Sequence, residues 1–258
     1  MRSVLRRLWR WPASRAWSRA GAIAAVLSAG APRRVLVMST RIALLVGGSV
    51  LISIAIALML WNGFGPGPLD VFIVGLSSTT GLPLSVAVWA AFALMAGLAW
   101  LLGRRPGVGT LAAPLIIGPV VQATLVVLDG AAAPSGFVAG AILHVGAIGI
   151  AGVGAGALIV AGLGAGTGEL LTTAASARTG RSESPTRFAI EFGWLVVGIA
   201  LGGPIGPGTV LVAVLIGPSV AFGHRVVDRS VTHSRRRLGA AVPSRPVDPV
   251  APRECGVR

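Results

Sequence analysis

The chain has 258 residues, of which 54% are hydrophobic and 12% are charged, and its formal net charge is +14. A soluble domain of this size could not keep so many apolar side chains out of water, so the composition excludes a soluble protein and indicates an integral membrane protein. The single cysteine, Cys255, excludes an internal disulfide and a cysteine-based metal cluster, and we expect no bound metal and no cofactor.

Residues 1–38 and residues 229–258 are rich in arginine and are predicted to be tails on either side of the membrane domain. Basic flanks mark the cytoplasmic side, so we expect both termini in the cytoplasm and anionic lipid headgroups as partners of the tails. The second tail also carries several prolines, which predicts disorder. The tails have charge without an aromatic stacking face or a groove-reading helix, so we expect no binding to nucleic acid.

Six apolar runs approach the length of about 20 residues that crosses a hydrocarbon core of about 30 Å. They cover residues 41–61, 84–102, 108–128, 137–161, 187–201 and 209–227. The runs lack the alternation of barrel strands and contain many glycines, as transmembrane helices do. We therefore predict an all-α membrane domain over residues 39–228 with six transmembrane helices.

Two glycine-rich segments interrupt the apolar sequence, GFGPGPLD at 63–70 and GLGAGTGE at 162–169, and each ends at an acid, Asp70 or Glu169. Equivalent glycines are ninety-nine positions apart, so that Gly63, Gly65 and Gly67 correspond to Gly162, Gly164 and Gly166. Glycine lets the backbone turn sharply, and irregular backbone inside a membrane is tolerated only within protein or beside a water-filled cavity. The two breaks are therefore predicted to lie in the protein interior.

The same spacing of ninety-nine positions continues along the chain and defines two repeats, residues 39–129 and 138–228. Each repeat holds three predicted spans and a stretch that is too short to cross the membrane, at 68–80 or 167–178. We predict that these stretches are re-entrant half-helices. With three crossings in each repeat, the second copy must be inverted relative to the first.

The charges of the loops agree with an inverted repeat. The loop with Arg104 and Arg105 is predicted to be cytoplasmic, whereas its repeat equivalent at 202–206 is uncharged and is predicted to lie outside. Both tails then fall on the cytoplasmic side, so that six spans satisfy every loop.

The first span, the GFGPGPLD break, the RTG turn at 178–180 and the glycine-rich segment that ends in IG at 216–217 resemble the YczE/YyaS/YitT-type bacterial integral membrane proteins, most closely the YczE branch. The resemblance covers about residues 39–228. It implies a multi-pass protein of the bacterial cytoplasmic membrane, and it implies no defined biochemical activity.

The paired acids Asp70 and Glu169 are the leading candidates for a functional site. Each is predicted near the third position of its half-helix, where a carboxylate can cap the backbone N–H groups. The alternative is that both half-helices aim at a midplane site for an ion or a solute. The prolines that kink equivalent spans and a rare polar residue complete the candidate set: Pro119, Pro218 and Gln122.

Two functions remain open, and neither is enzymatic. The sequence has no HExxH, no GxSxG and no lysine, so we expect no enzyme. The symmetric breaks, acids and prolines favour a permease for an unknown small solute or ion that works by rocking of the repeats. The alternative is a non-transporting membrane scaffold or accessory subunit, and a homo-oligomer is compatible with both.

Overall fold

The computed structural model describes residues 38–132, 134 and 136–240, and of residues 234–240 it describes the backbone alone. The predicted tail at residues 1–37 and the last 18 residues lie outside the described part. Within the described part the secondary structure is entirely helical. Eight helices follow one another: α3 (Met38–Trp61), α4 (Pro68–Thr80), α5 (Leu84–Leu101), α6 (Val108–Leu128), α7 (Phe137–Ala161), α8 (Thr167–Thr179), α9 (Glu183–Ala200) and α10 (Pro207–Ala240).

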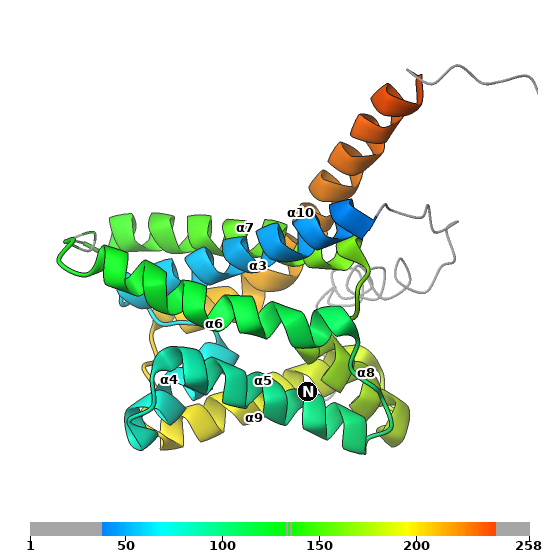
Figure 1. The fold of residues 1–258 in the computed structure, drawn as a ribbon. Helices are drawn as coiled ribbons and strands as arrows, with labels where there is room; N and C mark the ends of the chain where they lie inside the picture. The colour runs from blue at the N-terminus through cyan, green and yellow to red at the C-terminus, as the bar shows by residue number, and fades with distance from the viewer. Residues whose placement is uncertain (1–37, 133, 135, 241–258) are drawn as a thin grey trace, which may run out of the picture.

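The helices form two layers (Figure 1). Helices α3, α6, α7 and α10 form one layer, in which α3 packs against both α6 and α7, and α7 packs against α10. Helices α4, α5, α8 and α9 form the other, in which α4 packs against α9 and α5 packs against α8. The packing of α5 on α6 connects the layers.

Five of the six predicted spans are helices that are long and apolar enough to cross a membrane. They are α3, α5, α6, α7 and the part of α10 up to His233. Helix α9 has 18 residues, as α5 does, but it carries Glu183, Arg187 and Glu191 and is not among these five. The described part is therefore helical and has five candidate membrane spans, and the sixth crossing stays a prediction.

The helix boundaries repeat at the spacing found in the sequence. Helices α4 and α8 each have 13 residues and begin ninety-nine positions apart, as do α5 and α9. The glycines that end the two short helices, Gly81 and Gly180, are also equivalent and have φ values of 70° and 68°. This left-handed conformation costs glycine little and ends both helices with the same backbone geometry.

Helices α3 and α7 run in opposite directions along their shared interface. Arg41 at the start of α3 donates from Nη2 to the Gly162 carbonyl at the end of α7, over 3.3 Å. Asn62, just after α3, donates from Nδ2 to the Gly140 carbonyl near the start of α7, over 2.8 Å. Because these helices hold equivalent places in the two repeats, their antiparallel contact is compatible with inversion.

Helix α10 extends farther than the predicted last span. The sequence has no proline between Pro218 and Pro243, and the helix continues as far as Ala240. Residues 229–240, which we predicted to belong to a disordered tail, are therefore helical. Arginine is a good helix former, so charge alone does not end a helix when it leaves the membrane.

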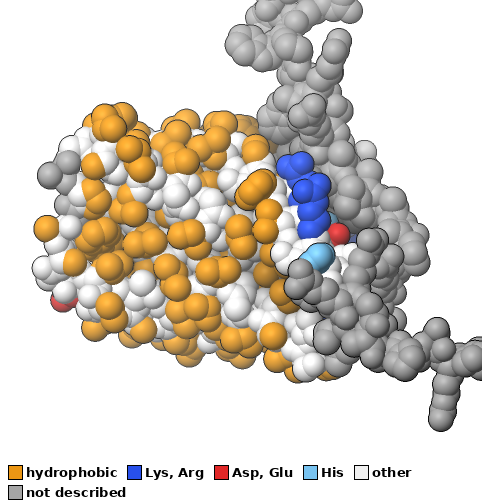
Figure 2. All heavy atoms as spheres, turned by 90° about the horizontal axis from the view of Figure 1, so that it is seen from above, with side chains coloured by type: hydrophobic (Ala, Val, Ile, Leu, Met, Phe, Trp, Pro, Cys, Tyr) orange, Lys and Arg blue, Asp and Glu red, His pale blue; other side chains and the backbone are white. Residues whose placement is uncertain are grey.

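Small residues allow the long helices to approach closely. A Cβ on Gly152 would lie 2.5 Å from the Ser219 carbonyl oxygen, and Gly48 would place one 2.7 Å from the Gly154 oxygen. Side chains any larger would push these helices apart, as is typical of helix contacts in membranes. The outer surface is mainly hydrophobic, and the visible arginines gather at one end (Figure 2).

Candidate functional site

The two acids begin their short helices in the same way. Gly67 is the N-cap residue of α4, and a Cβ on it would lie 3.2 Å from Asp70 Oδ2. Gly166 is the N-cap residue of α8, and a Cβ on it would overlap Glu169 Oε2. Each carboxylate thus folds back over the N-cap residue, which is the position of the acid in a capping box. This position is compatible with the predicted capping role, which stays a prediction.

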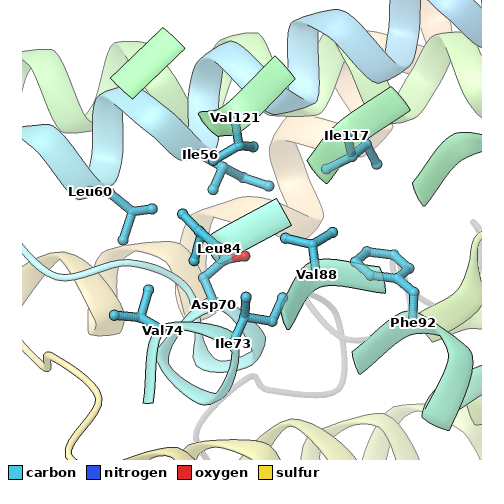
Figure 3. A pocket seen from close by; sticks show the side chains of 10 residues that line it. All are labelled: Ile56, Leu60, Asp70, Ile73, Val74, Leu84, Val88, Phe92, Ile117 and Val121. Carbon is cyan, nitrogen blue, oxygen red and sulfur yellow. The ribbon is translucent and has the colours of Figure 1, made fainter. Parts of the chain in front are cut away.

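The surroundings of Asp70 are otherwise apolar. Its side chain points into a cavity of about 10 Å³ between α3, α4, α5 and α6 (Figure 3), about the smallest space that holds one water molecule. We call this space the Asp70 cavity. The other residues that line it are all hydrophobic: Ile56, Leu60, Ile73, Val74, Leu84, Val88, Phe92, Ile117 and Val121. The lining therefore offers the carboxylate no cationic partner.

The surroundings of Glu169 are charged. Arg187 on α9 places Nη1 3.6 Å from Glu169 Oε1, and its Nε donates to Glu191 Oε1 over 2.9 Å. The side chains of Glu169 and Arg187 are 42% and 46% exposed. At the equivalent positions of the first repeat stand Val88 and Phe92, both of which line the Asp70 cavity. We call the Glu169, Arg187 and Glu191 cluster the Glu169 site.

The other predicted site residues lie elsewhere. The side-chain oxygen of Gln122 is buried and has no hydrogen-bond partner among the described residues, yet Gln122 does not line the Asp70 cavity. Pro119 is exposed, and Pro218 lines a second hollow on another face. The structure thus brings none of Asp70, Glu169, Gln122, Pro119 and Pro218 together in one described cavity. In the described part no three potential metal ligands gather either.

The glycine breaks are held by contacts that the sequence reasoning missed. The Gly208 N–H donates to the Phe64 carbonyl over 2.7 Å, and the Gly109 N–H donates to the Leu163 carbonyl over 2.9 Å. Gly109 and Gly208 are repeat equivalents, as are Phe64 and Leu163. Each break is therefore fixed by the start of the last helix in the other repeat. The matching GVGT and GPGT motifs were the feature of the sequence from which these contacts could have been predicted.

A close approach of backbones accompanies these bonds. Gly164 has a φ of 149°, and a Cβ on it would lie 2.8 Å from Thr110 Oγ1. The Thr110 hydroxyl donates to the Ala165 carbonyl over 2.6 Å. Gly65 has a φ of 103°, and a Cβ on it would likewise lie 2.8 Å from Thr209 Oγ1. Gly63 and Gly162 also have positive φ values, of 67° and 60°, so four of the six predicted break glycines could not be replaced by another residue without strain.

His144 lies next to the first of these breaks. Its side chain is completely buried in α7, and its ring centroid is 5.9 Å from that of Phe64. A Cβ on Gly208 would lie 2.5 Å from His144 Nε2, so the ring rests on the Gly208 backbone. The small residue at 208 thus leaves the space that the imidazole fills.

The comparisons with known proteins identify a family. No curated protein and no solved structure matches the chain. One family does match, over residues 39–225, and it is described as a family of unknown function (DUF6198). The matched region nearly coincides with the predicted membrane domain at 39–228 and contains both short helices, α4 and α8. This chain belongs to the family of unknown function DUF6198.

Proposed function

We propose that this membrane protein is a permease for a small solute or ion, in which Asp70 binds the proton or cation that accompanies transport. The observation that carries the proposal is the Asp70 carboxyl group in a cavity lined otherwise by hydrophobic residues. The resemblance to YczE-type proteins of the bacterial cytoplasmic membrane agrees with this location.

An ionised carboxylate is costly in such a place. Acids inside membrane domains are rare, and they usually pair with a cation or mark a path for protons or ions. The Gly67 backbone N–H and the positive end of the α4 dipole give partial compensation. Because no basic side chain lines the cavity, a proton or a bound cation is the remaining way to neutralise Asp70.

The unequal packing of the two repeats supports movement between states. Helix α5 packs on α6 and encloses the Asp70 cavity, whereas among the described residues α9 has no comparable contact with the equivalent helix, α10. The Glu169 site is correspondingly about half exposed. In transporters with inverted repeats, the two repeats take different conformations in each state and exchange them during alternating access. An opposite state would close α9 on α10 and release α5 from α6.

A second candidate, a non-transporting scaffold, is favoured by the size of the Asp70 cavity. With room for about one water molecule, this space fits a closed and nearly dry core. In that case Asp70 would serve only as the cap of α4. The two candidates differ in what happens when the carboxylate is replaced by an amide, which keeps an acceptor oxygen but cannot titrate.

The test uses the full chain, Asp70→Asn, and Glu169→Gln as the matched control. Each protein is reconstituted into liposomes with a pH-sensitive dye inside, and proton movement is followed under a pH gradient with a panel of ions and small solutes. The melting temperature of the detergent-purified proteins is measured against pH and cation in parallel, since anything that binds the native state raises its stability.

We expect the wild type and Glu169→Gln to move protons in response to at least one solute, and Asp70→Asn to fall to the rate of protein-free liposomes. We also expect the Asp70→Asn protein to fold and to lose a dependence of melting temperature on pH or cation that the control retains. Identical behaviour of wild type and Asp70→Asn in both measurements would overturn the permease and leave the scaffold.

A further inference from the structure

A second hollow opens on the outside of the molecule where α3, α7 and α10 meet. Its volume is about 550 Å³, within the range of about 300–1,000 Å³ that is usual for small-molecule sites. We call it the α10 hollow. Its lining is hydrophobic or small throughout: Leu51, Gly146, Gly149, Ile150, Val153, Pro218, Ser219 and Phe222. None of the candidate acids lies in it, so it is separate from the Asp70 cavity.

Two glycines that line this hollow are not needed for helix packing. A Cβ on Gly146 or Gly149 would meet no atom within 4 Å. On the same helix, a Cβ on Gly152 would lie 2.5 Å from the Ser219 oxygen, and one on Gly156 would overlap the His224 nitrogen. Glycine at 152 and 156 therefore serves the contact with α10, whereas glycine at 146 and 149 leaves space that the protein itself does not fill.

The hollow continues along α10 into a basic stripe. Pro218, Phe222, Arg225 and Arg229 follow one another at spacings of four, three and four residues, which places them on one face of the helix. The Arg225 Nε donates back to the Ala221 carbonyl over 3.2 Å, so its guanidinium lies along the preceding turn of α10. The Phe222 side chain is 58% exposed at the rim.

The depth of the hollow fits the dimensions of a bilayer. At a rise of 1.5 Å per residue, Arg225 lies about 27 Å along α10 from Pro207, close to the thickness of the hydrocarbon core. Pro218 lies about 16 Å from the same starting point, in the half of the membrane that adjoins the arginines. If α10 enters the hydrocarbon core at Pro207, these arginines reach the headgroups of the opposite leaflet, and the hollow lies beside the acyl chains of that leaflet.

We infer that the α10 hollow binds one acyl chain of an anionic phospholipid whose phosphate is held by Arg225 and Arg229. The apolar lining of the α10 hollow matches an acyl chain, and the basic stripe next to it matches a negatively charged headgroup. Asp228 lies between the two arginines in the sequence, but Arg235, Arg236 and Arg237 follow on the same helix and keep this end basic. The inference is independent of transport by Asp70.

The test compares two lipids with identical acyl chains, phosphatidylglycerol and phosphatidylcholine, added to the detergent-purified full chain. Lipids that stay bound are counted by native mass spectrometry, and the melting temperature is recorded. Gly149→Leu places a larger side chain in the hollow, and its Cβ would meet no atom within 4 Å. Gly47→Leu is the matched control, because Gly47 is the repeat equivalent of Gly146 and also has no neighbour within 4 Å.

We expect phosphatidylglycerol to bind more tightly than phosphatidylcholine and to raise the melting temperature more. Gly149→Leu should lose this effect, and Gly47→Leu should keep it. Arg225→Gln and Arg229→Gln should each weaken phosphatidylglycerol binding roughly fivefold, corresponding to about 1 kcal/mol per arginine, and should leave phosphatidylcholine unchanged.

Equal effects of the two lipids on the wild type would overturn the inference, as would full retention of lipid binding in Gly149→Leu. A dimer that dissociates only in Gly149→Leu would also overturn it, because the occupant would then be a second copy of the chain.

Discussion

Asp70 and Glu169 hold equivalent positions in the two repeats, but the electrostatic surroundings of their carboxylates differ. Both are in the first turn of a 13-residue helix after an N-cap glycine. Hydrophobic side chains surround Asp70, whereas Glu169 pairs with Arg187. The repeated glycines therefore place the acid, and side chains from the next helix decide whether it has a cation beside it.

The difference comes from two positions on that next helix. Val88 and Phe92 on α5 correspond to Arg187 and Glu191 on α9. Charged residues make α9 less apolar than α5, and its buried residues are Thr186 and Gly198, of which Gly198 lies against α4. The residue that pairs with Glu169 thus lies on a helix that packs on α4 and α8 and is otherwise largely exposed.

The largest expected effect concerns the side of the membrane on which equivalent loops lie. Arg105 and Pro204 are repeat equivalents and are both exposed. In a Cys255→Ser background, we expect an impermeant thiol reagent to label Pro204→Cys in intact cells and to leave Arg105→Cys unlabelled, because inversion places the loops on opposite sides. The measurement is the labelled fraction of each protein.

Permeabilised cells give the control for this experiment, since both cysteines should then react. Equal labelling of the two positions in intact cells would show parallel repeats. In that case α4 and α8 would lie on the same side of the membrane, and the comparison between their acids would lose its basis in symmetry.

The next effect concerns the glycines that anchor the two breaks. A Cβ on Gly208 would lie 2.5 Å from His144 Nε2 and 2.6 Å from the Gly65 oxygen, whereas one on Gly109 would lie 2.9 Å from Leu163 Cβ. We expect Gly208→Ala to lower the free energy of unfolding by roughly 1–3 kcal/mol, and Gly109→Ala to lower it less. Unfolding in mixed micelles with increasing denaturing detergent measures both.

Gly97→Ala on α5 is the control for these substitutions, because a Cβ there meets no atom within 4 Å. Alanine should stabilise that helix by up to about 1 kcal/mol, since its helix propensity exceeds that of glycine. If Gly208→Ala lowers the free energy of unfolding no more than Gly97→Ala does, the contact of Gly208 does not hold the first break.

Much of the fold could be predicted because long apolar runs and a repeated glycine spacing are local signals. The short helices were predicted at 68–80 and 167–178, and they span Pro68–Thr80 and Thr167–Thr179. The start of α9 at Glu183 was missed because its first turns are polar. The extension of α10 was missed because basic composition was taken as a sign of disorder.

The site could be predicted only in part. The repeat places Asp70 and Glu169 at the same position behind an N-cap glycine, and their capping role stays a prediction. A shared cavity depends on how two half-helices from different repeats are placed in space, which no local pattern encodes. The contrast between Val88 and Arg187 was present in the sequence, but its meaning required knowing that α5 encloses the Asp70 cavity.

The smallest effect concerns the ion pair that distinguishes the two sites. Arg187→Met removes the charge and keeps an unbranched stem, and it makes the surroundings of Glu169 resemble those of Asp70. Because the side chains of the pair are 46% and 42% exposed, we expect a loss of about 0.2–1 kcal/mol in the free energy of unfolding. High salt should reduce this loss, since exposed charges are screened.

A double-mutant cycle of Arg187→Met with Glu169→Gln isolates the contribution of the pair from the packing of the Arg187 stem. The same cycle with Glu191→Gln measures the second partner, whose Oε1 lies 2.9 Å from Arg187 Nε. Coupling energies well above about 1 kcal/mol that do not change with salt would mean that the pair is shielded from water. The Glu169 site would then be as enclosed as the Asp70 cavity, and the proposed difference in access between the repeats would fail.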